Sequence, residues 1–212
     1  MPLILKKNLA PEGVWGLWDI IEPESYFMER LAFSIIEKAN LDQIKGHRRL
    51  EWLAARYLLH LLSERHRRGE ILKDEFGKPF LSGADWDISL SHSNNMAGVA
   101  AFAKPVGVDV QKIVAKIERI AHKYLSDYEA ANIRYRNRLE YLHLYWGAKE
   151  AMYKAYGRKA IDFKGHMKIE PFIFNPKGGK MVGTLKKGTV SMSFDIEYEL
   201  FGAFVIVIAK SL

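Results

Sequence analysis

The sequence contains no cysteine, which excludes disulfide bonds and any mechanism that needs a thiolate. It also lacks an apolar run of the ~20 residues that a membrane-spanning helix requires, so no membrane partner is expected. The first residues do not combine positive charge, an apolar stretch and a cleavage site, as a signal peptide would. These absences favour a cytoplasmic protein of ordinary globular composition.

Length and charge narrow the class further. The 212 residues are enough for one large domain or two small ones. Lysine and arginine number 32 against 25 acidic residues, which gives a formal net charge of +7. This excess favours an acidic partner or a phosphorylated ligand, without deciding between them.

The hydrophobic pattern predicts a mixed α+β chain. Apolar residues recur at helical spacing in four segments, and they alternate or cluster as in strands in eight others. The expected helices are 23–36, 47–62, 117–124 and 137–156, and the expected strands are 14–20, 87–91, 96–103, 106–110, 168–174, 180–186, 189–198 and 201–210.

A faint internal echo suggests that the chain has two related halves. The segment 87–104 resembles 194–210, and each half reads as a long helix followed by strands that pair in sequence. We therefore expect two similar α+β halves, 1–105 and 106–212, packed together. A chance match between two apolar strands is the alternative.

One strand contains an acid where propensity disfavours it. Asp109 interrupts the apolar run of Val106, Gly107, Val108 and Val110. A carboxylate inside a valine-rich strand is unfavourable by both strand propensity and burial. Such violations of local rules tend to mark functional positions.

A long helix near the middle of the second half carries a second candidate group. Trp146, Glu150 and Lys154 are four residues apart, so they line one helical face, and Gly157 stands where a C-terminal cap is expected. Glu150 could hold a cation there, and Lys154 an anion. An ordinary solvated ion pair is the alternative interpretation.

Further motifs accompany these two. The strand Val106–Asp109 is followed by Trp146–Lys154, so that Glu150 stands 41 positions after Asp109. The other ordered motifs are Arg48–Arg56, Phe76–Pro79, Ile88–Ser93 and Tyr124–Glu129. Together they resemble the 4'-phosphopantetheinyl transferases, specifically the larger monomeric group that acts on carrier domains of synthetases. The resemblance covers residues 47 to 157.

The resemblance implies a reaction and a metal site. These enzymes transfer the phosphopantetheine arm of coenzyme A to a carrier-protein serine and release 3',5'-ADP. Asp109 and Glu150 would hold Mg²⁺, with Mn²⁺ as the alternative, because hard cations in phosphate sites take one or two carboxylates. Glu150 would also orient or deprotonate the serine, Lys154 would meet the phosphate that is transferred, and Lys149 would support a phosphate. The catalytic set is thus Glu150, Lys154 and Asp109.

Other residues would contact coenzyme A by the same resemblance. Ser91 and His92 would face phosphate oxygens, although His92 could also be a satisfied loop histidine. The adenine would be bordered by Gly77, Lys78 and Pro79, with Lys73 nearby, and the 3'-phosphate would meet Arg48 or Arg49. For Arg56, a role in binding coenzyme A and a purely structural role within the fold are equally compatible with the sequence. The family's pseudo-twofold fold would place the site where the two halves meet.

The sequence departs from the family pattern at two positions. Many relatives have a second acid where this chain has Gln111. An amide is a weaker Mg²⁺ ligand than a carboxylate. Either the Gln111 carbonyl oxygen or a water molecule would therefore complete the metal site. The small hydroxyl or thiol residue usual after the aromatic is Gly147, and a helix-interior glycine costs about 1 kcal/mol against alanine.

The expected partner is an acidic apo carrier protein. A basic face would speed the encounter, with candidates at 112–123 and 134–138, although ordinary solvated helix charge is the alternative there. A monomer would suffice, and no nucleic acid is expected. Two other classes stay open: a non-catalytic coenzyme A- or carrier-binding homologue, indicated by Gln111, and a basic nucleic-acid-binding module, hinted at by Tyr135 between two arginines.

Overall fold

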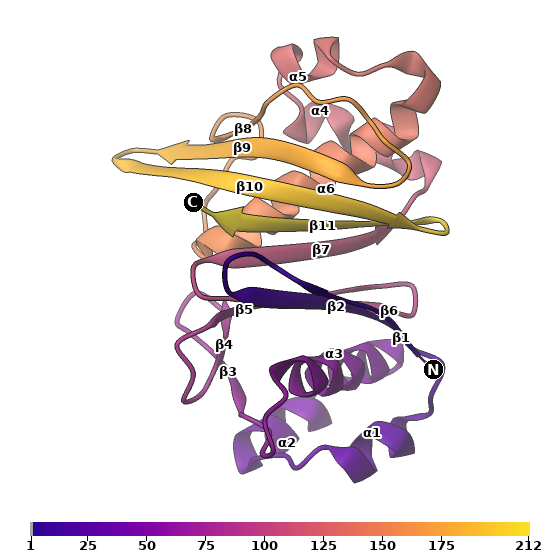
Figure 1. Ribbon diagram of the computed structural model, residues 1–212, viewed down its shortest axis with the longest axis vertical. Helices are drawn as coiled ribbons and strands as arrows, with labels where there is room; N and C mark the ends of the chain where they lie inside the picture. The colour runs from indigo at the N-terminus through magenta and orange to yellow at the C-terminus, as the bar shows by residue number, and fades with distance from the viewer. Residues whose placement is uncertain (1) are drawn as a thin grey trace. The chain divides into compact units, whose positions relative to one another are not determined.

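The computed structural model describes residues 2–212 and divides the chain into two compact units, Met1–Ala103 and Lys104–Leu212. Each unit combines helices with one antiparallel sheet, as Figure 1 shows. The expected mixture of helices and antiparallel strands is therefore confirmed. Among the described residues, no helix has both the length and the apolar character needed to cross a bilayer.

The first unit is a six-stranded sheet in the order β1-β2-β6-β5-β4-β3. Helix α3 lies along one face of this sheet (Figure 1) and packs on β2 and β6 through its buried leucine and alanine stripe. The elements are β1 Leu3–Asn8, β2 Gly13–Asp19, α1 Glu24–Arg30, α2 Ile35–Asp42, α3 His47–Ser63, β3 Ile71–Lys73, β4 Pro79–Leu81, β5 Asp87–Ser93 and β6 Met96–Phe102.

The prediction of one continuous helix over residues 23–36 is wrong, because two separate helices, α1 and α2, form there. Helix α1 ends at Leu31, whose backbone is extended. Ser34 then caps α2, since its side chain accepts a hydrogen bond from the Glu37 N–H and the Glu37 carboxylate accepts one from the Ser34 N–H. This capping box fixes a new helix start that the apolar spacing alone does not reveal.

The second unit is a five-stranded sheet in the order β7-β11-β10-β9-β8, with α6 packed against β7 and β11 (Figure 1). Its sheet and α6 share one core, which includes Leu142, Met152, Phe194 and Val207. The elements are β7 Val106–Lys112, η1 Ala115–Ile120, α4 Ala121–Tyr124, α5 Asp127–Ala131, η2 Tyr135–Asn137, α6 Arg138–Tyr156, β8 Met167–Ile169, β9 Gly179–Lys187, β10 Val190–Phe201 and β11 Phe204–Ser211.

One expected strand is much shorter than its apolar run. Of residues 168–174 only the first two belong to β8. Pro171 has no N–H to donate to a sheet ladder, and the Phe172 ring instead packs 5.2 Å from the ring of Tyr141 and 5.3 Å from that of Tyr145. Aromatic packing onto α6 explains the apolar pattern here without a strand.

Candidate active site

Helix α6 lies unusually close to strand β7 at one glycine. A Cβ atom on Gly107 would stand 1.8 Å from the carbonyl oxygen of Ala151. Only glycine permits this approach, which sets the backbone of α6 directly against the strand. Asp109 is two residues further along the same face of β7, and Glu150 precedes Ala151 on the helix. The glycine therefore brings the two predicted carboxylates to one place.

Asp109 lies at the centre of a charged cluster. Its side chain is buried, with the residue 8% exposed. Lys154 donates hydrogen bonds to Asp109 Oδ1 and to the carbonyl oxygen of Val108, both at 2.8 Å. The Gln111 amide nitrogen donates to Asp109 Oδ2 at 3.0 Å. An acid in this strand is thus tolerated because both of its oxygens have donors.

Glu150 belongs to the same cluster. Burial and, to a smaller extent, the negative charge of Asp109 raise the pKa of its carboxyl to about 7, against the opposing effect of the Lys154 ammonium. Two carboxylates that repel each other in a partly buried site attract a cation. The described residues contain no group of three or more His, Cys, Asp or Glu arranged for a metal. A pair of carboxylates fits a hard cation that also takes substrate phosphate and water.

Gln111 faces the same cluster with its amide nitrogen. Its carbonyl oxygen, the atom expected to complete a metal site, lies 2.6 Å from Nδ1 of His143. The Val114 N–H donates to His143 Nε2 at 3.0 Å, and burial lowers the pKa of this imidazole. Neutral His143 can therefore donate from Nδ1 to Gln111, which leaves the Gln111 amide to donate to Asp109. A metal-ligating role for Gln111 stays a prediction. It would require the side-chain amide of Gln111 to rotate, so that its carbonyl oxygen faces the two carboxylates.

His143 was not anticipated from the sequence. It is 2% exposed and lies one helical turn before Gly147 on α6. The sequence does contain one indication of its role, because His143 is the single polar imidazole among the leucine and tyrosine residues of 141–145. Gly147 is now explained, because a Cβ there would stand 2.7 Å from the Gln111 amide nitrogen and 2.9 Å from Val207.

Lys149 requires a correction. It does not reach the Asp109 cluster but is 0% exposed on the other side of α6. Its ammonium donates to Glu129 Oε2 at 2.7 Å and to the carbonyl oxygens of Tyr124 at 2.6 Å and Phe163 at 2.9 Å. All three donor hydrogens are used inside the fold, so the phosphate contact expected of Lys149 does not fit this environment.

The remaining predicted residues all belong to the first unit. Ser91 is buried on β5, and His92 follows it with Nδ1 2.8 Å from a carboxylate oxygen of Glu51. Lys78 lies between Gly77, whose φ is +90°, and Pro79, the first residue of β4. Its ammonium is 2.6 Å from a carboxylate oxygen of Asp87.

Four further cations of this unit were named in the sequence analysis. Lys73 is exposed at the end of β3, and Arg48 is exposed in the first turn of α3. Its neighbour Arg49 instead donates to Glu24 at 2.6 Å. Arg56 is buried 3.3 Å above the Trp52 ring, which supports its interpretation as a structural tie.

We expect Gly107→Ala to destabilise the protein by about 3 kcal/mol or more, because the added methyl group would displace the α6 backbone. Urea unfolding followed by circular dichroism measures this. Gly188→Ala is the control, since Gly188 has φ +56° and nothing lies within 4 Å of the position that an added methyl group would take. Its cost should be about 1 kcal/mol from backbone strain alone. Equal costs would contradict the close approach of helix and strand.

The raised pKa of Glu150 predicts how stability depends on pH in metal-free protein. Between its ordinary value of 4.5 and about 7, the native carboxyl holds a proton that the unfolded chain releases. The free energy of unfolding contributed by this group therefore falls as pH rises through that window. Wild type in EDTA should lose stability relative to Glu150→Gln between pH 4.5 and 7, as measured by urea unfolding. Parallel pH curves would exclude the raised pKa.

Comparisons with known proteins relate part of the chain to one superfamily. Residues 105–207, which contain Asp109, Glu150 and Lys154, match the model of the 4'-phosphopantetheinyl transferase superfamily. A 4'-phosphopantetheinyl transferase of Bacillus subtilis is 27% identical over 88 residues, 40% of this chain and 39% of that protein. The 4'-phosphopantetheinyl transferase gsp of Aneurinibacillus migulanus is 28% identical over 113 residues, 51% of this chain and 46% of that protein. The matches thus span less than half the length of these curated relatives.

Proposed function

We propose that this chain is a 4'-phosphopantetheinyl transferase, and that it transfers the phosphopantetheine arm of coenzyme A to a serine of an apo carrier protein. The observation that carries this proposal is the cluster of Asp109, Glu150 and Lys154 on β7 and α6. In the reaction the serine oxygen bonds to the phosphorus that bears pantetheine. The bond from that phosphorus to the 3',5'-ADP oxygen breaks, and 3',5'-ADP leaves with the electron pair.

The chain's own residues account for the charges in this step. Asp109 and Glu150 present the carboxylate pair that fits Mg²⁺ or Mn²⁺, and the bound cation would neutralise the diphosphate of coenzyme A. Lys154 is held at a fixed position by Asp109 and Val108, from which its ammonium can meet the transferred phosphate. Glu150 would also orient or deprotonate the serine hydroxyl.

The first unit would supply the rest of the coenzyme A site. Ser91 and His92 would bind phosphate oxygens, and the Gly77–Pro79 turn with Lys73 would border the adenine. Exposed Arg48 is the better candidate for the 3'-phosphate, because Arg49 already pairs with Glu24. Each unit consists of an antiparallel sheet with a long helix packed on it, which supports the proposal of two similar α+β halves.

A direct assay tests the proposal. The protein is incubated with coenzyme A, Mg²⁺ and a panel of apo carrier domains, and the carriers are weighed by mass spectrometry. We expect the mass of one phosphopantetheine arm to be gained, together with release of 3',5'-ADP, and EDTA to abolish both. The panel also ranks fatty acid, polyketide and peptide synthetase carriers.

The second candidate function is a non-catalytic homologue that binds coenzyme A or a carrier. It is favoured by Gln111, which stands where many relatives have an acid. An acid there would be a third carboxylate, whereas the Gln111 carbonyl oxygen faces His143. Binding of coenzyme A with no transfer to any carrier would establish it. Gln111→Glu would then show whether the missing acid is the cause.

A further inference from the structure

The segment that follows α6 is rich in basic side chains. Residues 157–187 contain eight basic and two acidic side chains, so their net charge of +6 nearly equals the +7 of the whole chain. The basic residues are Arg158, Lys159, Lys164, Lys168, Lys177, Lys180, Lys186 and Lys187. By comparison, the segment 112–123 carries a net +3. The segment after α6 therefore carries a larger total charge than 112–123, and it is a further candidate surface beside the predicted segments 112–123 and 134–138.

A groove of about 270 Å³ lies within this charged surface. Lys164, Lys168 and Lys186 line it together with the hydroxyl residues Ser126 and Thr184. We call it the basic groove. Lysine ammonium groups suit carboxylates, each of which accepts several hydrogen bonds, and the Thr184 hydroxyl can add a donor, whereas the Ser126 hydroxyl already donates to Glu129 Oε2 at 3.0 Å.

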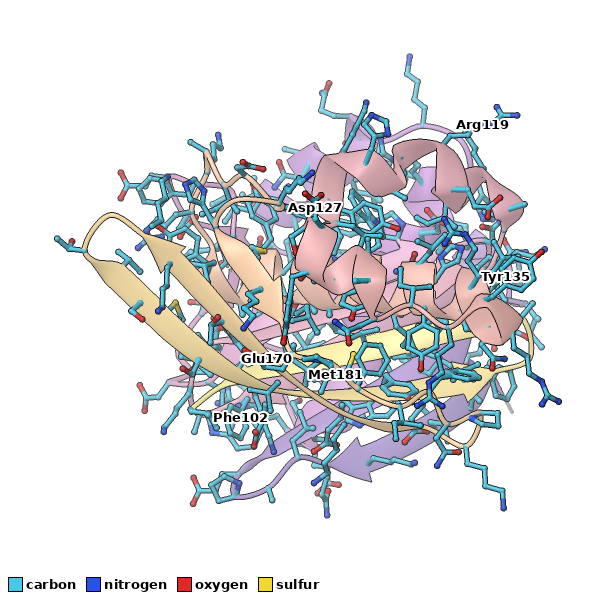
Figure 2. All side chains as sticks on the ribbon, turned by 90° about the horizontal axis from the view of Figure 1, so that it is seen from above. Phe102, Arg119, Asp127, Tyr135, Glu170 and Met181 are labelled. Atoms are coloured by element: carbon cyan, nitrogen blue, oxygen red, sulfur yellow. The ribbon has the colours of Figure 1, made fainter. Side chains whose placement is uncertain are left out.

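Two acids stand at the edge of the basic groove. Asp127 on α5 lies 3.5 Å from Lys164, and Glu170 after β8 lies 2.8 Å from Lys168; both acids are labelled in Figure 2. These pairs are solvent-exposed, and such pairs contribute little. A partner's carboxylates can therefore exchange with them at small cost, and the three lysines still outnumber the two acids.

The basic groove is tied directly to the helix that carries Glu150. Lys149, the residue before Glu150, donates to the carbonyl oxygen of Phe163 and to Glu129. The Phe163 ring also packs on α6, 5.5 Å from Trp146 and 5.7 Å from Tyr153. Lys164 follows Phe163. A partner held in the groove would therefore be held in a fixed relation to Glu150.

We propose that the basic groove docks the acidic face of the carrier protein whose serine is modified, an inference that rests on the proposed function. The charge of the segment selects an acidic partner. A protein surface fits better than a nucleic acid, because the rings that line the groove among the described residues are those of Tyr128 and His166, and the Lys168 ammonium already lies 4.6 Å from the centre of the Tyr128 ring, whereas single-stranded nucleic acid is bound on successive aromatic platforms.

The test compares two sets of charge reversals of equal size. One variant combines Lys164→Glu, Lys168→Glu and Lys186→Glu, and the control combines Lys116→Glu, Arg119→Glu and Lys123→Glu. We expect the groove variant to raise the KM for the carrier at least ~10-fold at low salt, with kcat at saturating carrier and coenzyme A affinity unchanged. The control should shift KM by less than ~3-fold, because it makes the same change in net charge elsewhere.

Several results would overturn the proposal. Equal KM shifts in both variants would assign the effect to net charge, and a larger shift in the control would place docking at 112–123. Loss of coenzyme A affinity in the groove variant would assign the groove to the nucleotide. Salt-dependent binding of an RNA oligonucleotide that the groove variant alone loses, with carrier kinetics intact, would make it a nucleic-acid site.

Failure of the proposed function remains distinguishable from failure of the docking site. If wild type transfers nothing to any carrier, calorimetry of wild type and the groove variant with the same apo carriers still reports on docking. Binding to wild type that the groove variant loses would support the groove. Undiminished binding to the groove variant, or no binding to wild type, would refute it. A neutral variant, Lys164→Gln with Lys168→Gln and Lys186→Gln, should show a smaller shift of the same kind.

Discussion

Glu150→Gln is expected to lower the rate of phosphopantetheine transfer by about a thousandfold, and Asp109→Asn should have an effect of the same order. Each change keeps the shape of the side chain and removes one of the two charges that would hold the cation. Lys154→Ala should also lose rate, because it removes the ammonium that donates to Asp109 Oδ1. Single-turnover mass spectrometry of the carrier measures all three rates.

The loss must be separated from damage to the fold. Glu140→Gln provides a matched control, since it makes the same chemical change in the first turn of α6, away from Asp109. Glu150→Gln should unfold no more easily than wild type at pH 7, because the native environment already disfavours the charge of Glu150. Near-normal turnover in Glu150→Gln or Asp109→Asn would refute the metal-site assignment.

The parts of the site that could be predicted from sequence are those fixed by local rules. The strand through Asp109 and the helix through Glu150 were expected, and α6 does end at Gly157 with φ +68°. Ser126 and Glu129 also form a capping box, whose Ser-x-x-Glu pattern is visible in the sequence, with the Ser126 hydroxyl accepting from the Glu129 N–H at 3.2 Å. Helical periodicity, caps and strand composition depend on neighbours in sequence, so each is readable from it.

The parts that could not be predicted depend on partners far along the chain. The direction of Lys149 is set by Glu129, which the helix pattern does not reveal, and Gln111 is oriented by His143, 32 residues away. Strand β1 was missed because half of it is exposed and its two lysines obscure any apolar alternation. Burial of charge and register between strands are tertiary properties, and local spacing carries little information about them.

The second large effect concerns stability. We expect Lys149→Met to lower the free energy of unfolding by about 3–5 kcal/mol, because breaking a buried ion pair leaves one charge uncompensated. Lys149 and Glu129 are both 0% exposed. Glu129 would retain hydrogen bonds from Ser126 and from the Ile169 N–H at 2.9 Å but would lose the cation that pairs with it. Urea unfolding monitored by tryptophan fluorescence measures the loss, with exposed Lys164→Met as a control expected to stay within about 0.5 kcal/mol.

The double variant Lys149→Met with Glu129→Gln decides whether the pair itself is responsible. It should recover part of the stability, since no buried charge then lacks a partner, even though Tyr124 and Phe163 lose a donor. A role in binding phosphate makes the opposite prediction. Under that role Lys149→Met would keep its stability and lose coenzyme A affinity, and Glu129→Gln would restore nothing. The buried pair connects α5 and the segment after α6 to the helix that carries Glu150, so weakening it should also loosen the basic groove.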